Sequence, residues 1–257
     1  MNFGDLSPNW QMTALFLLML LPLVLLMKLA AFWGKPESKD WALILAPFPS
    51  PISVKRALPL SAGPRLIRRF FVALSVCIGA YWLYWNVWEG FRLPPVLRSF
   101  VGAFMLWIVS EALGSLLPFI EMHSGRLLPL PHGSAPPLAK GLSDFWGRRW
   151  NVWTSDWFRQ IIFRPLQARP MLALFVVFLV SGILHEWVIN IPLYVVTGRS
   201  CFGSMTLYFL LQALGILIER RTRHRGVRIF LVWLFVFGAA PLMVNEGLLR
   251  VLHLWPE

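Results

Sequence analysis

Charged residues are scarce in this sequence. Only 14% of its 257 residues are charged, whereas 57% are hydrophobic. A soluble chain needs polar surface to cover its apolar interior, and this composition supplies too little of it. An ordinary soluble domain is therefore excluded, and lipid is expected to solvate much of the chain.

Several signatures of soluble and secreted proteins are also missing. The two cysteines, Cys77 and Cys201, imply neither a disulfide framework nor a metal site. The chain has no Asn-x-Ser/Thr sequon, no glycine-rich phosphate loop and no Gly-x-Ser-x-Gly elbow. The commonest soluble-enzyme chemistries are excluded, and neither a metal nor a resident cofactor is expected.

Long apolar runs are present instead. A helix needs about 20 apolar residues to cross roughly 30 Å of hydrocarbon. We expect six spans, at residues 11–33, 70–89, 97–120, 170–190, 203–219 and 227–250. The predicted fold class is therefore all-α, a transmembrane helical bundle that forms a single membrane domain over residues 1–257.

The basic residues alternate between the two sides of these spans. A net charge of +12 would suggest nucleic acid in a soluble protein, but here 20 of the 24 Lys and Arg residues fall on one side and 4 on the other. The positive-inside rule predicts cytoplasmic basic loops, one of them at residues 121–169, and both termini outside. The membrane would be the bacterial inner membrane or the endoplasmic reticulum, and no nucleic-acid partner is expected.

The loop before the fourth span carries an amphipathic pattern, SDFWGRRWNVWTSDWFRQIIFRPL. Ser143 or Asp144 is expected to cap a helix, and Arg148, Ser155 and Arg159 lie on its polar face. The other face presents Trp146, Trp150, Trp153, Trp157 and Ile161. Such a helix is typical of the membrane headgroup region. It could serve only to anchor the loop to lipid.

Ionisable residues inside an apolar span each need a partner or a function, and Glu111, His185 with Glu186, and Glu246 are the three places of interest. His185 can act as a general base near neutral pH, and small residues share its helix face. It could instead only pack and hydrogen-bond to a neighbour such as Ser181. Glu186 points away from His185 and favours a supporting role, and Glu111 and Glu246 are expected to pair with Arg or His. The remaining histidines, in loops or at the C-terminus, are expected to be solvated.

The motif SDFWGRRWN, followed about 30 residues later by SGILHEW, resembles the wax synthase branch of the membrane-bound O-acyltransferase superfamily in order and spacing. The close resemblance covers Leu142 to Ile191. In that superfamily a polar loop residue and a histidine of the following helix form the active site for acyl transfer from acyl-CoA to a hydroxyl. By position these correspond to Asn151 and His185, and the chain is shorter than typical plant wax synthases.

The resemblance implies a wax synthase-like enzyme that joins a fatty acyl group to a lipid alcohol, with acyl-CoA as co-substrate. Basic side chains such as Arg148, Arg149 and Arg159 are expected to hold the CoA phosphates. Substrate contacts are expected at Trp146, Arg148, Arg149, Trp150, Ser181 and Glu186. The acceptor could instead be a sterol, a diacylglycerol, a polysaccharide or a protein. A transporter or lipid-binding scaffold with a buried His/Glu network is the alternative from another class.

Overall fold

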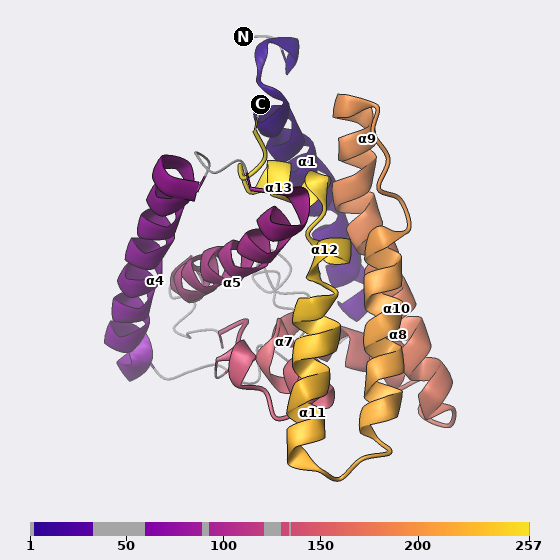
Figure 1. Cartoon of the computed structure of the whole chain (residues 1–257). Helices are drawn as coiled ribbons and strands as arrows, with labels where there is room; N and C mark the ends of the chain where they lie inside the picture. The colour runs from indigo at the N-terminus through magenta and orange to yellow at the C-terminus, as the bar shows by residue number, and fades with distance from the viewer. Residues whose placement is uncertain (1–2, 33–59, 89–92, 121–129, 134, 257) are drawn as a thin grey trace.

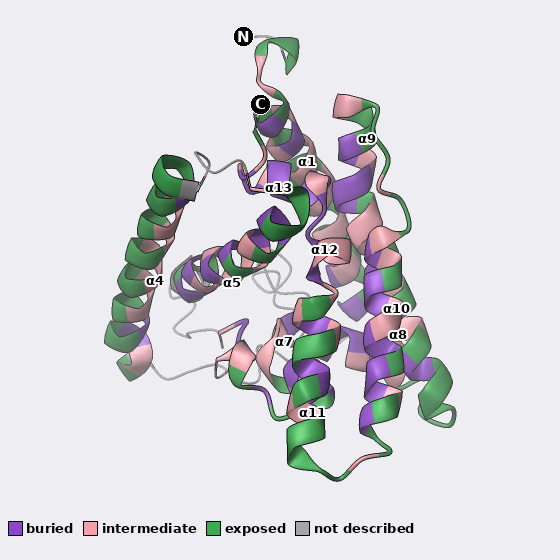
Figure 2. Cartoon of the chain, viewed as in Figure 1, coloured by how far each residue is buried: buried purple, intermediate pink, exposed green. Residues whose placement is uncertain are grey.

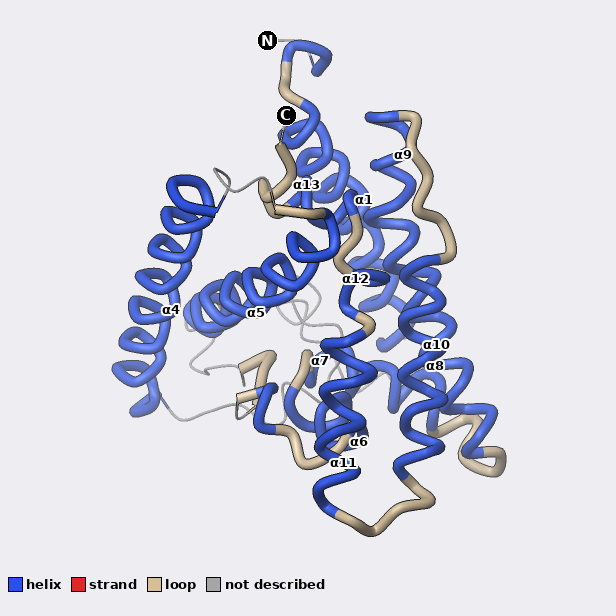
Figure 3. Tube along the Cα trace, viewed as in Figure 1, coloured by secondary structure: helices blue, strands red, loops and turns tan. Residues whose placement is uncertain are grey.

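The computed structural model describes residues 3–32, 60–88, 93–120, 130–133 and 135–256. These residues form helices, turns and loops, and no strand occurs among them (Figure 3). The prediction of an all-α multi-span bundle is confirmed. Residues 121–129 of the expected cytoplasmic loop lie outside the described residues.

The first half of the chain contains three long apolar helices: α1 (Pro8–Phe32), α4 (Gly63–Leu83) and α5 (Pro95–Ile120). The second expected span begins seven residues early, because Pro64 sits in the first turn of α4, where its fixed φ suits a helix start. A π-helical turn, Tyr84–Trp88, extends α4 at its other end. α4 packs against α5, and its other faces are largely exposed (Figure 2).

The second half is built on α8 (Pro170–His185), which continues through a π-helical turn, Glu186–Asn190, into α9 (Ile191–Thr197). The fourth span is therefore a continuous 28-residue element, Pro170–Thr197, longer than expected. α10 (Ser204–Glu219) returns along α8. Its 16 residues cover about 24 Å at 1.5 Å per residue, somewhat less than the hydrocarbon thickness.

The sixth expected span, 227–250, is divided. α11 (Arg225–Val232) passes through a π-helical turn at Trp233–Gly238 into the short α12 (Ala240–Met243), and α13 (Glu246–Val251) follows after a break. Asn245 caps α13 by accepting a hydrogen bond from Leu248 N–H at 3.3 Å. The stretch Arg225–Met243 is the part of this region that is long and apolar enough to cross a membrane.

In the described part of the chain, five helices are long and apolar enough to span a membrane, and α10 is a shorter apolar helix beside them. Both termini lie at one end of the bundle, and the turn between α10 and α11 lies at the other (Figure 1). That turn carries the exposed arginines Arg220, Arg221, Arg223 and Arg225. Separation of this basic turn from the termini agrees with the alternating charge pattern of the sequence.

Ion pairs satisfy Glu111 and Glu246, two of the acidic groups within the expected spans. Arg69 of α4 donates to Glu111 of α5 at 2.5 Å. Glu246 accepts from Arg199 at 2.9 Å and from Arg250 at 2.9 Å. The predicted pairing of Glu111 and Glu246 with basic partners is confirmed, and both pairs link separate elements of the bundle.

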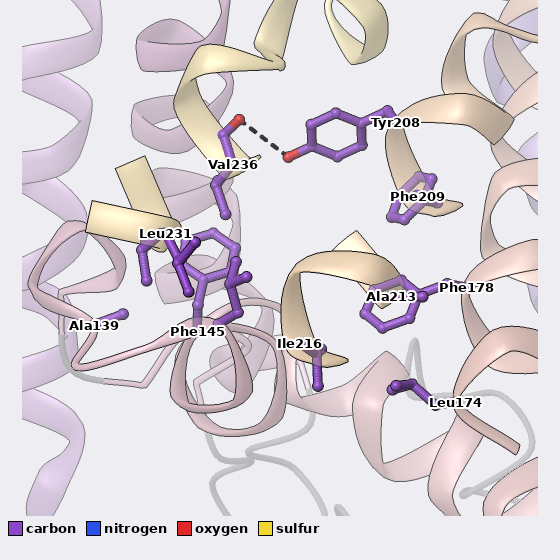
Figure 4. Packing of buried hydrophobic residues seen from close by; sticks show 12 residues of the cluster. Ala139, Phe145, Leu174, Phe178, Tyr208, Phe209, Ala213, Ile216, Leu231 and Val236 are labelled. Carbon is purple, nitrogen blue, oxygen red and sulfur yellow. Dashed lines mark hydrogen bonds between the residues drawn. The ribbon is translucent and has the colours of Figure 1, made fainter. Parts of the chain in front are cut away.

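One apolar cluster joins α8, α10, α11 and the loop before α8 (Figure 4). Phe178 of α8, Phe209 of α10 and Phe145 of the loop are all at least 95% buried. Tyr208 lies in the same cluster, and its hydroxyl donates to the carbonyl of Val236 at 3.3 Å. The cluster attaches the loop to the two helices that carry the fourth and fifth spans.

α8 and α10 approach closely at Gly182. A Cβ atom at this glycine would lie 2.6 Å from Cα of Thr206, so a larger residue there would force the helices apart. Small residues allow close approach of helix backbones in membranes, where packing replaces the hydrophobic effect as the main attraction.

Gly182→Ala should lower the midpoint of thermal unfolding in detergent, because the added methyl group overpacks the α8–α10 contact, at a cost of about 1–3 kcal/mol. Gly79→Ala in α4 is the matched control, since a Cβ there meets nothing within 4 Å. Better helix propensity should leave the control midpoint unchanged or slightly raised. Equal midpoints for the two variants would contradict the tight contact.

Candidate active site

The loop motif folds into two short helices rather than one. α6 (Leu142–Asp144) begins after Gly141 and runs into a π-helical turn, Phe145–Arg149. The chain then breaks at Trp150 and Asn151, and α7 (Val152–Phe158) follows. The expected continuous helix with Ser143 or Asp144 as its cap is therefore wrong, because Asn151 leaves the helical conformation.

This break separates the tryptophans that were expected to share one lipid-facing stripe. Trp153 and Trp157 are 6% and 7% exposed, and Trp157 Nε1 donates to the carbonyl of Met27 in α1 at 2.7 Å. Trp146 packs instead against the cluster between α8 and α10. Both arms of the motif therefore pack on protein, α7 on α1 and α6 on α10.

Asn151 occupies a left-handed backbone conformation with φ 39°. Its side chain caps α7, with Oδ1 accepting from Thr154 N–H at 3.3 Å. Asparagine is among the residues that tolerate this conformation, and its short amide is a favoured helix cap. The cap leaves Nδ2 as the donor end of the amide.

His132 lies against this break, although it was expected to be a solvated loop residue. It is 4% exposed, so that expectation is wrong. Its Nδ1 accepts from Asn151 N–H at 3.3 Å, and its Nε2 lies 2.9 Å from Oγ of Ser110 in α5. Burial lowers the pKa of His132 below its ordinary value, so the ring is neutral at neutral pH. No local pattern in the proline-rich segment around it indicates burial.

His185 ends α8, and its ring has one defined tautomer. Nδ1 lies 2.7 Å from the carbonyl oxygen of Ser181, which can only accept a hydrogen bond. Nδ1 therefore carries the proton, and Nε2 of the neutral ring keeps a lone pair. This is the state that a general base requires.

An aromatic side chain of α10 lies against His185. The ring of Phe209 lies 4.6 Å from the imidazole, between centroids, and Trp146 lies 5.7 Å from Phe209. Trp146 is held by a 3.2 Å hydrogen bond from Nε1 to Gln212 Oε1. The loop motif and the helical motif, which are distant in sequence, thus meet through Trp146.

In the described part of the chain Asn151 and His185 do not contact each other directly. A series of neighbouring aromatic rings lies between them. Phe145 neighbours Trp146 at 5.1 Å and stacks on Trp150 at 5.9 Å. Trp150 in turn lies 4.7 Å from His132, which holds the Asn151 backbone. The expected residues Trp146 and Trp150 therefore belong, with Phe145 and Phe209, to one row of aromatic side chains. This row lies between His132, beside Asn151, and His185.

Glu186 faces protein groups with both of its carboxylate oxygens. Oε1 accepts from Thr206 N–H of α10 at 3.0 Å, and Oε2 accepts from Asn190 Nδ2 at 2.5 Å. The carboxylate thus ties α8 to the first turn of α10, in keeping with the supporting role expected from its direction on the helix. Ser181 is buried, and its carbonyl oxygen orients His185.

The three loop arginines differ in their partners. Arg149 donates to Asp144 at 2.7 Å and Arg159 to Asp156 at 2.8 Å. Although burial opposes ionisation of Asp144, the Lys140 N–H and Arg149 lower its pKa below the ordinary value. Arg148 is exposed and forms no ion pair within the described part of the chain. It lines a pocket of about 140 Å³ with Ser143, Asp144 and Arg228.

Part of this chain matches a model of a known protein family. Residues 131–211, which hold both motifs and the segment around His132, match the family model described as "Membrane bound O-acyl transferase family". This segment is similar to that family. The wax synthase-like branch is the part of the family that the relatives of the chain indicate.

Two Arabidopsis thaliana proteins illustrate the relationship. The chain is 36% identical to "Probable long-chain-alcohol O-fatty-acyltransferase 9" over 172 residues, which are 63% of this chain and 49% of the relative. It is 32% identical to "Probable long-chain-alcohol O-fatty-acyltransferase 7" over 124 residues, 42% of this chain and 35% of the relative. The chain thus spans half or less of the length of these relatives.

A third Arabidopsis thaliana relative, "Acyl-CoA--sterol O-acyltransferase 1", is 42% identical over 65 residues, 22% of this chain and 19% of that protein. No solved structure matches the chain significantly. The names of these relatives differ in the acceptor that they state.

Glu186→Gln should lower the thermal midpoint, because glutamine offers one acceptor and one donor where two donors, Thr206 N–H and Asn190 Nδ2, converge. An unsatisfied buried donor costs about 1–3 kcal/mol. Glu111→Gln is the comparison, since the amide oxygen can still accept from the partly exposed Arg69. A smaller loss in Glu186→Gln than in Glu111→Gln would contradict the tying role of Glu186.

Proposed function

We propose that the chain is a membrane O-acyltransferase that moves a fatty acyl group from acyl-CoA to the hydroxyl of a lipid alcohol. The observation that carries the proposal is the tautomer of His185, which leaves a lone pair on Nε2 of a ring that lies 4.6 Å from the ring of Phe209, between centroids. The names of the similar plant proteins support the acyl donor and the class of acceptor.

In this mechanism Nε2 of His185 removes the proton of the acceptor hydroxyl as its oxygen attacks the thioester carbonyl. Collapse of the tetrahedral intermediate breaks the C–S bond, and the imidazolium returns its proton to the CoA thiolate. The Ser181 carbonyl accepts from Nδ1–H throughout, which orients the ring and stabilises its charged form. Phe209 and Trp146 keep water from the thioester.

Asn151 acts on the acyl group in this proposal. Its Oδ1 is occupied by Thr154 N–H, so Nδ2 is the end that donates to the thioester oxygen as negative charge develops there. Its position at the N-terminus of α7 adds a favourable field for that charge.

Arg148 and Arg228 bind the phosphates of acyl-CoA. Both line the same pocket, and Arg228 reaches it from α11, while Glu219 neutralises only part of the positive charge near it. Arg149 and Arg159 instead bind carboxylates of the loop and hold its shape. The basic end of the bundle faces the cytoplasm, where acyl-CoA is found, in accord with the charge asymmetry of the loops.

His185→Ala should lower kcat for ester formation by about 10² to 10⁴-fold, because the general base is lost. Purified protein in detergent is given labelled palmitoyl-CoA with a panel of long-chain alcohols, sterols and diacylglycerol, and labelled ester is measured. His224→Ala, which removes an exposed imidazole from the α10–α11 turn, should keep near-normal kcat.

Two outcomes would overturn the proposal. Near-normal transfer by folded His185→Ala would remove the base from the mechanism. A folded wild-type protein that forms no ester with any acceptor would favour a transporter or lipid-binding scaffold, in which His185 and Glu186 serve a buried polar network.

Arg148→Ala should raise KM for acyl-CoA about 3 to 10-fold and leave kcat nearly unchanged, because an exposed arginine contributes less than a buried charge-assisted bond. Arg228→Ala should act in the same direction. Arg164→Ala is the matched control, since this exposed loop arginine does not line the pocket and should change KM less than about twofold. Equal KM values for Arg148→Ala and Arg164→Ala would place the phosphate site elsewhere.

A further inference from the structure

A short segment, Pro131–Gly133, runs beside the break in the loop motif and is bound to it at three points. Gly133 N–H donates to the carbonyl of Arg149 at 3.0 Å, and Val152 N–H donates to the carbonyl of Pro131 at 2.7 Å. Between these two bonds, Asn151 N–H donates to Nδ1 of His132 at 3.3 Å. The middle bond of the three is therefore made by a side chain rather than by the backbone.

This middle bond holds a residue in a costly conformation. A left-handed conformation costs most non-glycine residues roughly 1–2 kcal/mol, and although asparagine tolerates it better than most, local contacts are needed to select it over the extended and helical alternatives. Asn151 has φ 39°, and its cap on Thr154 restrains only its side chain. His132 restrains the backbone N–H of the same residue.

α5 fixes the other edge of the His132 ring. Because Nδ1 accepts from Asn151, the neutral ring carries its proton on Nε2, which donates to Ser110 Oγ at 2.9 Å. The Ser110 hydroxyl in turn donates to the carbonyl of Trp107 at 2.8 Å. Pro131 packs so closely on Gly114 of α5 that a Cβ there would lie 2.3 Å from its ring.

Aromatic stacking and neighbouring charges complete the surroundings of His132. Trp150 lies 4.7 Å from the ring, between centroids. Burial lowers the pKa of His132 most, and of the charged groups that act on it Glu111 raises the pKa and Arg69 lowers it, while the neighbouring Arg149 backbone also raises it. A neutral His132 suits this balanced environment, and only the neutral ring has an Nδ1 lone pair for Asn151.

We propose that His132 is a positioning residue for acyl transfer, which holds Asn151 in the left-handed conformation that aims its amide at the acyl group. This inference rests on the function proposed for Asn151. It makes α5, through Ser110 and His132, a structural support of the site, although α5 lies outside the sequence region matched to the family.

Two substitutions of His132 test its two hydrogen bonds separately. The amide oxygen of His132→Asn can replace Nδ1 and accept from Asn151 N–H, whereas the longer amide of His132→Gln replaces Nε2 and keeps the bond to Ser110. Both variants lose the stacking on Trp150, so they are matched. His132→Asn should keep kcat within about threefold, and His132→Gln should lower it about 10 to 100-fold, since small misplacements of a reacting group cost that much.

Two further measurements distinguish positioning from a general structural role. Hydrogen exchange of the Asn151 and Val152 amides, followed by mass spectrometry on the full protein in detergent, should accelerate in His132→Gln and stay near wild type in His132→Asn. In a double-mutant cycle, His132→Gln should lower kcat far less in the Asn151→Ala background than alone.

Equal exchange rates in the two variants would overturn the proposal, as would full additivity of His132→Gln and Asn151→Ala. A wild-type protein without transfer activity would overturn the proposed function, and the exchange comparison would still decide whether His132 holds Asn151. If the two variants differ in exchange rate but have equal kcat values, His132 restrains Asn151 and catalysis does not depend on that restraint. This outcome would also overturn the proposal.

Discussion

The close contact of α8 with α10 is the constraint on which the site depends. Gly182 lets the backbones meet at Thr206, and Glu186 accepts the Thr206 amide one turn later. This fixes the register of α10, so Phe209 lies beside the imidazole of His185. In a bilayer, where lipid is as apolar as the side chains, such packing and hydrogen bonding provide the attraction between helices.

The loop motif is attached to this helix pair by its own aromatic residues. Phe145 and Trp146 enter the α8–α10 cluster, and Trp157 bonds to α1. Asn151 lies at the break between these two attachments, where its backbone is strained and its side chain caps α7. A residue between two anchored arms is held more firmly than one on a free loop, as the role proposed for Asn151 requires.

The arginines at the basic end of the bundle differ in their partners. Arg149 and Arg159 are paired with Asp144 and Asp156, which lie five and three residues before them in the loop. Arg228 of α11 is paired with Glu219 of α10, and it lines a pocket together with Arg148. The first two pairs are between near neighbours in the sequence, whereas the shared pocket of Arg148 and Arg228 depends on how the fold brings α11 to the loop.

The sequence by itself determined the helical membrane fold, most span positions and the resemblance to the family, because hydropathy and the two motifs are local signals. It also predicted that Glu111 and Glu246 need basic partners, but the partners themselves come from the fold. Only the tertiary structure decided that the loop helix breaks at Asn151, that its tryptophans face protein, and that His132 is buried. Helical periodicity assumes a continuous helix, which the Pro131–Gly133 segment interrupts. Contacts between residues far apart in sequence, such as His132 with Ser110 or Glu186 with Thr206, have no local signature.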